Sequence, residues 1–554
     1  GNGALGGAIA GGEYNVAIGN YTLDALTSGD SNTAVGYNAG SAITTGIRNV
    51  LIGNEAGLAL TTGGSNVAVG HEALKNENGN GGNTAIGTQT LFTQDAGAEA
   101  YNVAVGFQAG VSITTGVRTI AIGGLAADGY DTENDNLAIG HAALGGAVAG
   151  GEFNVAIGNY SLDALTSGDK NTVIGYDAGG ALTTGSANTI IGENAGSNGA
   201  LTGDDNTVVG KIAGYALTSG HSNTLIGRHA ASALTTGVRN VALGMGANDS
   251  AADGENDNIA IGYNAMAAAS LAGAEFNVAV GSSALVAVTS GDANTAIGYN
   301  AGVGITTGDY NVAIGEDNMS AACTGDYNHI IGRDSGKAIT SGGNNLAIGG
   351  AAGYSITSGG SNISLGHDSG GVITSGNHNI HIGYKASGSG TGVDNEIAIG
   401  HGYDTTNFVG GGTGTVKIGM HNNSISNTFT SNATWAHSSD ERWKKNIADN
   451  SIGLDFINDL RTVTYNWKAF SEIDPSLSEY NPEDTEYPHP EIQHGLIAQE
   501  VKAALDKNGI EKFAGWYEDQ THADKQQGIS ESMYVMPLIK AVQELSATVT
   551  TLQQ

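Results

Sequence analysis

The stretch Asn32–Arg48, "NTAVGYNAGSAITTGIR", decides how most of this chain folds. It begins with a short β-prone segment, turns at a glycine, adds a second apolar pair at Ala42 and Ile43, and turns again at Thr-Thr-Gly. Variants of the pentad Asn-x-Ala-Ile-Gly recur 24 times, with glycines 17 to 19 residues apart from Gly19 to Gly419. A fixed period of this length is typical of repeat folds, so we expect each repeat to form one coil.

The strand of each repeat has two faces. In "NVAIG" at residues 15–19, Val16 and Ile18 share one face and Ala17 points the other way. We expect the β-branched pair of every coil to stack into an apolar column that the coils bury together. At about 4.8 Å per rung, 24 coils would form a rod roughly 115 Å long. The predicted fold is mainly β, a long parallel β-roll or β-solenoid.

An asparagine stands four residues before the repeat glycine in 21 of the 24 copies, and Thr119, Glu396 and Thr415 are the exceptions. Asparagine tolerates turn conformations, and stacked asparagines hydrogen-bond along a ladder, so we interpret these residues as structural. The competing interpretation is an array of amides that binds sugars or metal ions, and it requires side chains that face outward.

Aromatic and histidine side chains recur directly after the repeat glycine, which places them in turns. Such tyrosines can stack on sugars or pack between turns, and the sequence leaves both readings open, so we assign no receptor residue. The residues considered are Tyr37, Tyr176, Tyr263, Tyr299, His71, His141, His367 and His401.

Two acidic inserts, at 131–135 and 253–257, suggest calcium, because hard cations need several oxygen ligands in one loop. Neither insert matches the spacing of an EF-hand loop or a calcium-binding β-roll, so the structural interpretation is preferred. The sole cysteine, Cys323, cannot form an intrachain disulfide, and no Cys/His set has zinc-ligand spacing. We expect no cofactor and no metal.

The formal net charge of -33 argues against a nucleic-acid partner, because nucleic-acid affinity comes mainly from clustered Lys and Arg. The sequence has no run of eighteen apolar residues, which is about the length needed to cross a bilayer, so we expect no membrane insertion. The chain begins with Gly1 and has no signal pattern, from which we expect the true N-terminus to be missing.

The composition changes near residue 434, since all four tryptophans and all five prolines follow it. We therefore expect three parts: a repeat rod at 1–419, a linker at 420–439 and an α+β domain at 440–554. The last part should end in a helix over about 534–554 with a coiled-coil seam. The seam residues are Leu538, Val542, Leu545, Val549 and Leu552.

The segment "SSDERWKKNI" at 438–447 resembles the Ser-Asp-x-Arg-x-Lys-x-x-Ile signature that opens the self-cleaving intramolecular chaperone of phage endosialidase tailspikes and many tail fibres. Further matching segments follow in order: "LDFINDLRTVTYNWKAF", "HGLIAQEV" and "YVMPLIKAVQEL". Together they cover essentially all of the last 115 residues. The repeats resemble the trimeric β-roll of autotransporter adhesin heads, with a somewhat longer period.

The chaperone resemblance implies a self-cleavage site at the Ser439–Asp440 bond and a serine–lysine dyad of Ser439 and Lys444. The hydroxyl needs a base to take its proton, and a lysine is such a base only where burial or nearby cations lower its pKa. Arg442 and His437 are possible auxiliary residues. The enzyme activity expected is a single-turnover serine autopeptidase, with no turnover enzyme in the repeats.

The resulting hypothesis is a structural, host-receptor-binding tail fibre of a phage-like particle, located in the virion and assembled in the host cytoplasm. Its expected partners are two further copies of the chain in a homotrimer, a host cell-surface glycan or protein, and other virion tail proteins. Two alternatives stay open. One is a polysaccharide-degrading tailspike whose catalytic domain lies outside this sequence, and the other is a cellular surface adhesin.

Overall fold

In a computed structural model, the chain forms two compact units, Gly1–Ser438 and Ser439–Gln554. The structure describes residues 1–147, 149–249, 254–268, 273–421, 423–429, 436–437, 441, 444–475, 477, 480–485, 491–518 and 525–553.

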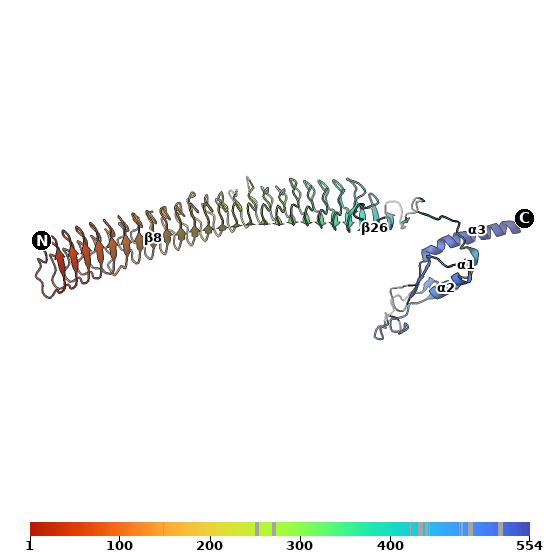
Figure 1. Ribbon diagram of the computed structural model, residues 1–554, viewed down its shortest axis with the longest axis horizontal. Coiled ribbons are helices and arrows are strands. Elements are labelled where there is room, and N and C mark those ends of the chain that lie inside the picture. Colours follow the sequence, from red (N-terminus) through yellow and green to blue (C-terminus); the bar gives the residue numbers. More distant parts are fainter. Residues whose placement is uncertain are drawn as a thin grey trace. The chain divides into compact units, whose positions relative to one another are not determined.

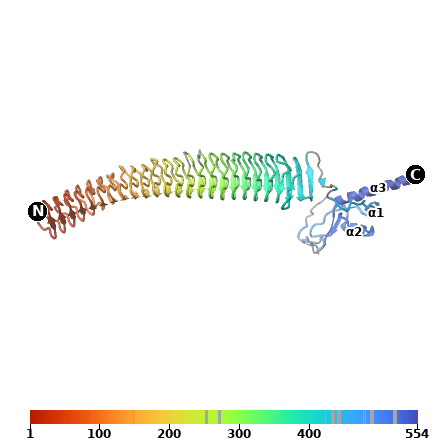
Figure 2. The ribbon, with the colours of Figure 1, turned by 45° about the horizontal axis from the view of Figure 1, so that its top comes forward.

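The first unit is a single file of coils, each of which adds one short strand to a parallel sheet (Figure 1; Figure 2). Strand β1 (Val16–Ile18) pairs with β2 (Thr33–Val35), so that Val16 lies opposite Thr33, one repeat later. The predicted parallel β-solenoid with turns of about 17 residues is therefore confirmed. The strands that follow are β3 (Val50–Ile52), β4 (Val67–Val69), β5 (Thr84–Ile86), β6 (Val103–Val105), β7 (Ile120–Ile122), β8 (Leu137–Ile139), β9 (Val155–Ile157), β10 (Thr172–Ile174), β11 (Thr189–Ile191), β12 (Thr207–Val209), β13 (Thr224–Ile226), β14 (Val241–Leu243), β15 (Ile259–Ile261), β16 (Val278–Val280), β17 (Thr295–Ile297), β18 (Val312–Ile314), β19 (His329–Ile331), β20 (Leu346–Ile348), β21 (Ile363–Leu365) and β22 (Ile380–Ile382).

The prediction of which strand face is buried was wrong. The middle residue of the strand, such as Ala34, is fully buried, whereas its neighbours Thr33 and Val35 are only half-buried. A coil of this length is narrow, and Ile43 from the second apolar segment already fills much of its interior. At the close packing of a protein core, only one side chain from each strand fits beside Ile43 or its equivalent. The β-branched pairs therefore line the outside.

The repeated asparagines point inward and link successive coils. The Asn49 amide nitrogen donates to the Gly63 carbonyl oxygen at 2.9 Å and to Asn32 Oδ1 at 3.0 Å. Its own Oδ1 accepts a hydrogen bond from the Asn66 backbone N–H at 3.0 Å. These side chains are buried, so the interpretation as outward-facing binding amides is wrong, and the structural interpretation holds.

The repeat glycine is required by close approach between coils. Gly36 has φ +142°, and a Cβ added to it would lie 2.2 Å from the Gly53 carbonyl oxygen of the next coil. Any other residue would push the coils apart, because backbone on both sides fixes the gap.

The parallel sheet ends in antiparallel strands. After β23 (Ala386–Ser387), β24 (Ile397–His401) and β25 (Phe408–Val409), β26 (Thr415–Met420) pairs antiparallel with β27 (Asn423–Thr428). Strand β28 (Ala436–His437) then pairs with β27. The expected linker at 420–439 is thus the segment that carries β27 and β28. These strands occupy the backbone edge that the last parallel strand would otherwise leave open.

A polar cluster replaces apolar packing inside the last coils. Glu396 stands where other coils have asparagine, and its Oε2 lies 3.5 Å from His381 Nε2, with both side chains fully buried. Burial alone would raise the pKa of Glu396. Hydrogen bonds from His381 and from the backbone N–H groups of Gly412 and Ser389 outweigh this effect and lower that pKa.

The second unit is built from short helices and two small hairpins. Its elements are α1 (Leu454–Asn458), β29 (Val463–Tyr465), β30 (Gln493–Gly495), α2 (Ala498–Lys507), β31 (Trp516–Glu518), β32 (Gln527–Ile529), a 3-10 helix (Glu531–Tyr534) and α3 (Val535–Leu552). The pairs β29–β30 and β31–β32 are antiparallel. Helix α3 confirms the predicted C-terminal helix.

We predict that Asn49→Ala destabilises the rod by about 1–3 kcal/mol, because the Gly63 carbonyl oxygen and the Asn66 N–H lose a buried partner. The urea midpoint, followed by the β-sheet circular dichroism signal, measures the change. Asn54→Ala is the matched control, because Asn54 lies in the same coil but is exposed. Equal midpoints for the two variants would show that the ladder does not stabilise the rod.

Candidate functional site

Three of the four segments quoted for the chaperone resemblance contribute to one core in the C-terminal unit, and they lie at 454–470, 494–501 and 534–545. Phe456 of α1 is buried together with Val501, Ala504 and Leu505 of α2. Phe513 and Tyr534 pack around Phe456, with ring centroids 5.6 Å and 6.3 Å away from its own. Segments up to ninety residues apart therefore depend on one another for folding.

The predicted cleavage residues fall at the start of this unit. Ser439, Asp440 and Arg442 lie outside the described residues. His437 is described by its backbone alone, which pairs with Ile425 of β27. Lys444 is exposed, and its backbone N–H donates to the Glu441 carbonyl oxygen at 2.9 Å. A lysine serves as the base for a serine hydroxyl only where burial or nearby cations lower its pKa, and the Lys444 side chain is not buried.

Helix α1 is coupled to α3 at its N-terminus. Gly453 precedes α1 and offers no side-chain cap. Glu544 of α3 takes that role, because its Oε2 accepts the Leu454 backbone N–H at 2.7 Å. This bond, assisted by Lys540, lowers the pKa of the Glu544 carboxyl. A carboxylate also suits the positive end of a helix.

The predicted coiled-coil seam of α3 has no cover within the described part of the chain. Its five residues are between 45% and 82% exposed, while Pro537 and Ala541 on another face are buried. Helix α3 packs on α1 through that buried face. The apolar seam is consequently free to contact another molecule.

A hollow of about 670 Å³ lies beside the base of α3. Leu460, Val463 and Leu496 supply apolar walls, and His494 and Glu531 supply polar ones. Leu538, the first residue of the seam, lines the same hollow. Leu538 therefore belongs to both the seam and the hollow.

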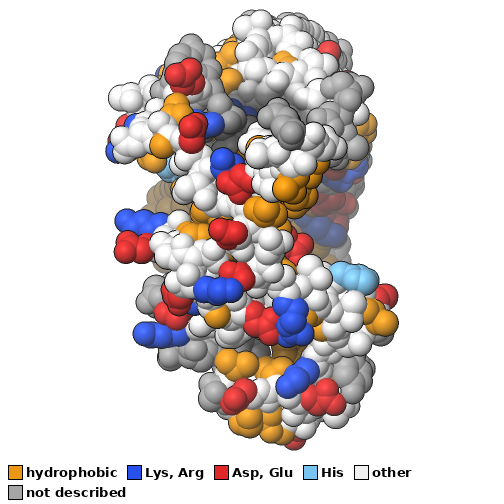
Figure 3. Space-filling model, turned by 90° about the vertical axis from the view of Figure 1, so that its right-hand side faces the viewer, with side chains coloured by type: hydrophobic (Ala, Val, Ile, Leu, Met, Phe, Trp, Pro, Cys, Tyr) orange, Lys and Arg blue, Asp and Glu red, His pale blue; other side chains and the backbone are white. Residues whose placement is uncertain are grey.

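The surface of this unit is mixed in charge, with acidic and basic side chains lying side by side (Figure 3). Lys507 Nζ lies 2.6 Å from Asp459 Oδ1, and the Arg461 guanidinium pairs with Glu500. Exposed pairs such as these add little stability.

The acidic inserts of the rod use their oxygens within the rod. Glu133 is buried, and its carboxylate accepts backbone N–H groups of Asp131, Thr132 and Gly150. Asp135 pairs with Arg118 at 2.6 Å. These oxygens are bound to protein donors and are not arranged around an ion.

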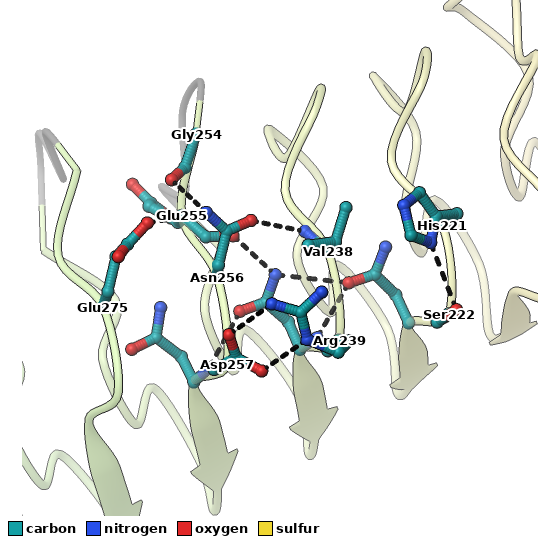
Figure 4. A network of polar contacts seen from close by, with 12 residues as sticks. His221, Ser222, Val238, Arg239, Gly254, Glu255, Asn256, Asp257 and Glu275 are labelled. Carbon is teal, nitrogen blue, oxygen red and sulfur yellow. Dashed lines mark hydrogen bonds and ion pairs between the residues drawn. The ribbon is translucent and has the colours of Figure 1, made fainter.

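The second insert repeats this arrangement. Asp257 faces Arg239 of the preceding coil at 2.6 Å, and Asn256 bridges the Val238 N–H and the Glu275 carboxylate (Figure 4). Asp253 lies outside the described residues. Among the residues that are described, no three His, Cys, Asp or Glu side chains gather as metal ligands would. No helix in the same residues has the length and apolar character needed to cross a membrane.

These features define a long β-solenoid followed by a small α+β unit with an exposed C-terminal helix. Residues 439–510 match a peptidase family described as the chaperone of endosialidase. No curated protein and no solved structure gives a significant match. The C-terminal unit therefore contains an endosialidase-type chaperone domain, and a solenoid that ends in such a domain fits a tail fibre with an intramolecular chaperone.

Two features of this unit were missed from the sequence. One is the contact between Glu544 and α1, and the other is the apolar hollow. Glu544 is separated from Leu454 by ninety residues, and no periodic pattern joins them. The exposed seam was found, because its four-and-three spacing is a local signal.

We predict that Glu544→Ala lowers the denaturation midpoint of the C-terminal unit, since α1 loses its cap. Tryptophan fluorescence reports on this part of the chain, because all four tryptophans follow residue 434. The midpoint should fall less in Glu544→Gln, because glutamine keeps an acceptor oxygen. It should not change in Gln543→Ala, which alters an exposed residue on the same helix.

The effect also depends on pH. The pKa of Glu544 lies below the usual 4.5, so its stabilisation is complete above that value and is lost as the pH falls through the lowered pKa. The difference between Glu544→Ala and the unchanged chain should therefore shrink in acid. A difference that grows in acid would contradict the capping role.

Proposed function

We propose that this chain is the structural and host-receptor-binding fibre of a phage-like particle, which its C-terminal chaperone domain trimerises and then releases by self-cleavage. The observation that carries the proposal is the chaperone match over residues 439–510, directly after a solenoid of parallel coils. In this proposal the rod is the mature product, and residues 440–554 act only during assembly. Its expected place is the virion.

The cleavage step follows from the chemistry of a serine–lysine dyad. Lys444 takes the proton of the Ser439 hydroxyl, and the oxygen attacks the Ser439 carbonyl carbon of its own chain or of a neighbouring one. The bond to the Asp440 nitrogen breaks, and the amine leaves with a proton. Water then hydrolyses the ester. Arg442 is proposed to stabilise the developing negative charge, and His437 to assist.

Burial of Lys444 during assembly is proposed to make cleavage wait for the trimer. A lysine takes the proton of a serine hydroxyl only where burial or nearby cations lower its pKa. When three chains meet through the α3 seams, the junction is expected to lose water, which lowers the lysine pKa. Cleavage would then follow correct trimerisation.

The outer face of the rod supports assembly into a trimer. Along the strands, outward residues such as Ile297, Ile331 and Ile348 are 36% to 41% exposed. They form a continuous apolar row because the strands pair in register. Two further copies of the same chain offer the same row with the same spacing, which makes a second copy the best match for it.

We predict that the intact chain splits after Ser439 when it folds, and that Ser439→Ala and Lys444→Ala both abolish the split. Mass spectrometry under denaturing conditions identifies the products. Lys445→Ala is the matched control and should cleave normally, because Lys445 does not occupy the signature position. An uncut parent chain, or cleavage by Lys444→Ala, would contradict the dyad.

We also predict that a triple variant, Ile297→Lys, Ile331→Lys and Ile348→Lys, does not form trimers. The charged side chains would be buried without partners in the proposed interface. Light scattering after size exclusion gives the molar mass. The control is the triple variant Ser290→Lys, Ser341→Lys and Ser358→Lys, which adds the same charge at exposed turns of the rod. It should still form the trimer. A trimer that survives the isoleucine changes would show that the strand face is not the interface.

A further inference from the structure

Rings accumulate at the C-terminal end of the rod, on the edge that follows the strands. The residues directly after the repeat glycine are aromatic or histidine in three consecutive coils, at His367, Tyr384 and His401. In no other part of the 24 repeats do three such residues follow one another. Because each coil sits on the next in register, these rings lie one above another.

Two more rings extend this column. The ring centroids of His367 and Tyr384 are 5.8 Å apart, and those of Tyr384 and His401 are 5.4 Å apart. Tyr403 follows at 6.1 Å from His401, and His421 at 4.7 Å from Tyr403. We name these five residues the aromatic row.

The backbone holds the aromatic row in place. Tyr403 and Thr406 pair with each other at the tip of a tight antiparallel turn between β24 and β25. The Gly402 N–H donates to the Tyr384 carbonyl oxygen at 2.8 Å, and the His421 N–H donates to the His401 carbonyl oxygen at 3.0 Å. The rings are therefore preorganised, and a ligand need not order them.

Polar groups stand beside the rings. The Tyr384 hydroxyl donates to Asp404 Oδ1 at 3.1 Å. Tyr384, His401, Tyr403, Asp404 and Thr405 together line a hollow of about 520 Å³. That volume falls within the roughly 300–1,000 Å³ of small-molecule sites, which also combine aromatic walls with a few polar groups.

The rings are open to a ligand. Tyr403 is 55% exposed, and neighbouring rings along the row are tilted by 35° to 77°. The stacked pair of Tyr310 and Tyr327 differs, because its rings are parallel within 5° at 5.0 Å. Packing between coils explains that pair, but it does not explain a hollow with rings and a carboxylate at its wall.

We propose that the aromatic row binds a neutral hexopyranose unit of a surface polysaccharide. The C–H face of a pyranose ring is apolar and packs on an aromatic face, while its hydroxyls need donors and acceptors such as Asp404, Thr405 and the Tyr384 hydroxyl. Lys385 is the nearby cation, with its Nζ 5.6 Å from the Tyr384 ring centroid and donating to the Asp404 carbonyl oxygen at 2.6 Å. The Asp404 carboxylate and the net charge of -33 disfavour an anionic sugar. This site deepens the proposed receptor-binding function, on which its biological meaning rests.

The test is saturation-transfer NMR on the full-length chain with methyl glucoside, methyl galactoside and methyl mannoside at millimolar concentration. We expect transfer to the ring protons of at least one of them, and none to glucuronic acid or N-acetylneuraminic acid. Tyr403→Ala and Asp404→Asn should each weaken binding about three- to tenfold. Both residues lie at the exposed tip of the turn, so their replacement should not unfold the rod.

Tyr299→Ala is the matched control, because Tyr299 directly follows a repeat glycine, as Tyr384 does, and is 55% exposed, but it lies five coils before Tyr384. It should bind as the unchanged chain does. No transfer to any neutral hexoside, stronger transfer to the acidic sugars, or equal loss in Tyr299→Ala would each overturn the site. Sugar binding and self-cleavage are measured separately, so a failed site and a failed fibre assignment give different results.

Discussion

The rod is held together by two contacts between successive coils. The backbones approach closely at the repeat glycine, and an inward asparagine amide forms hydrogen bonds from one coil to the next. The repeat glycine lets successive carbonyl groups approach where a Cβ would collide, as at Gly36. The asparagine then joins three neighbouring turns through buried hydrogen bonds, as at Asn49. A shift in register would leave buried amides without hydrogen-bond partners and would destabilise the fold. The parallel strands therefore stay in register.

The same narrow coil determines what the rod presents outside. Its interior accepts one residue from the strand, such as Ala34 or Leu51, and one from the second segment, so the residues on either side of the central strand residue are placed outward. The turn after each strand begins at the repeat glycine, and the residue that follows this glycine differs in type from coil to coil. Assembly surfaces and ligand sites can therefore be added to a rod of this type without disturbing its core.

The C-terminal unit follows different rules. Its core is assembled from segments far apart in the chain, and Glu544 joins α3 to the beginning of α1. Within the described residues, helix α3 exposes an apolar seam from Leu538 to Leu552. The solenoid needs no such long-range core, because each of its strands pairs with the strand of the next repeat, as Val16 does with Thr33.

The sequence by itself determined the repeat, the parallel coil, the change of texture after residue 434 and the seam of α3, because each of these is a local periodic signal. It also located the junction, since Ser439 and Lys444 belong to a contiguous motif. Only the tertiary structure decided which strand face is buried, because alternation defines two faces and the space inside the coil chooses between them. It likewise brought Tyr403 and Asp404 beside Tyr384, since the tip of a turn finds its neighbours only when the coils are stacked.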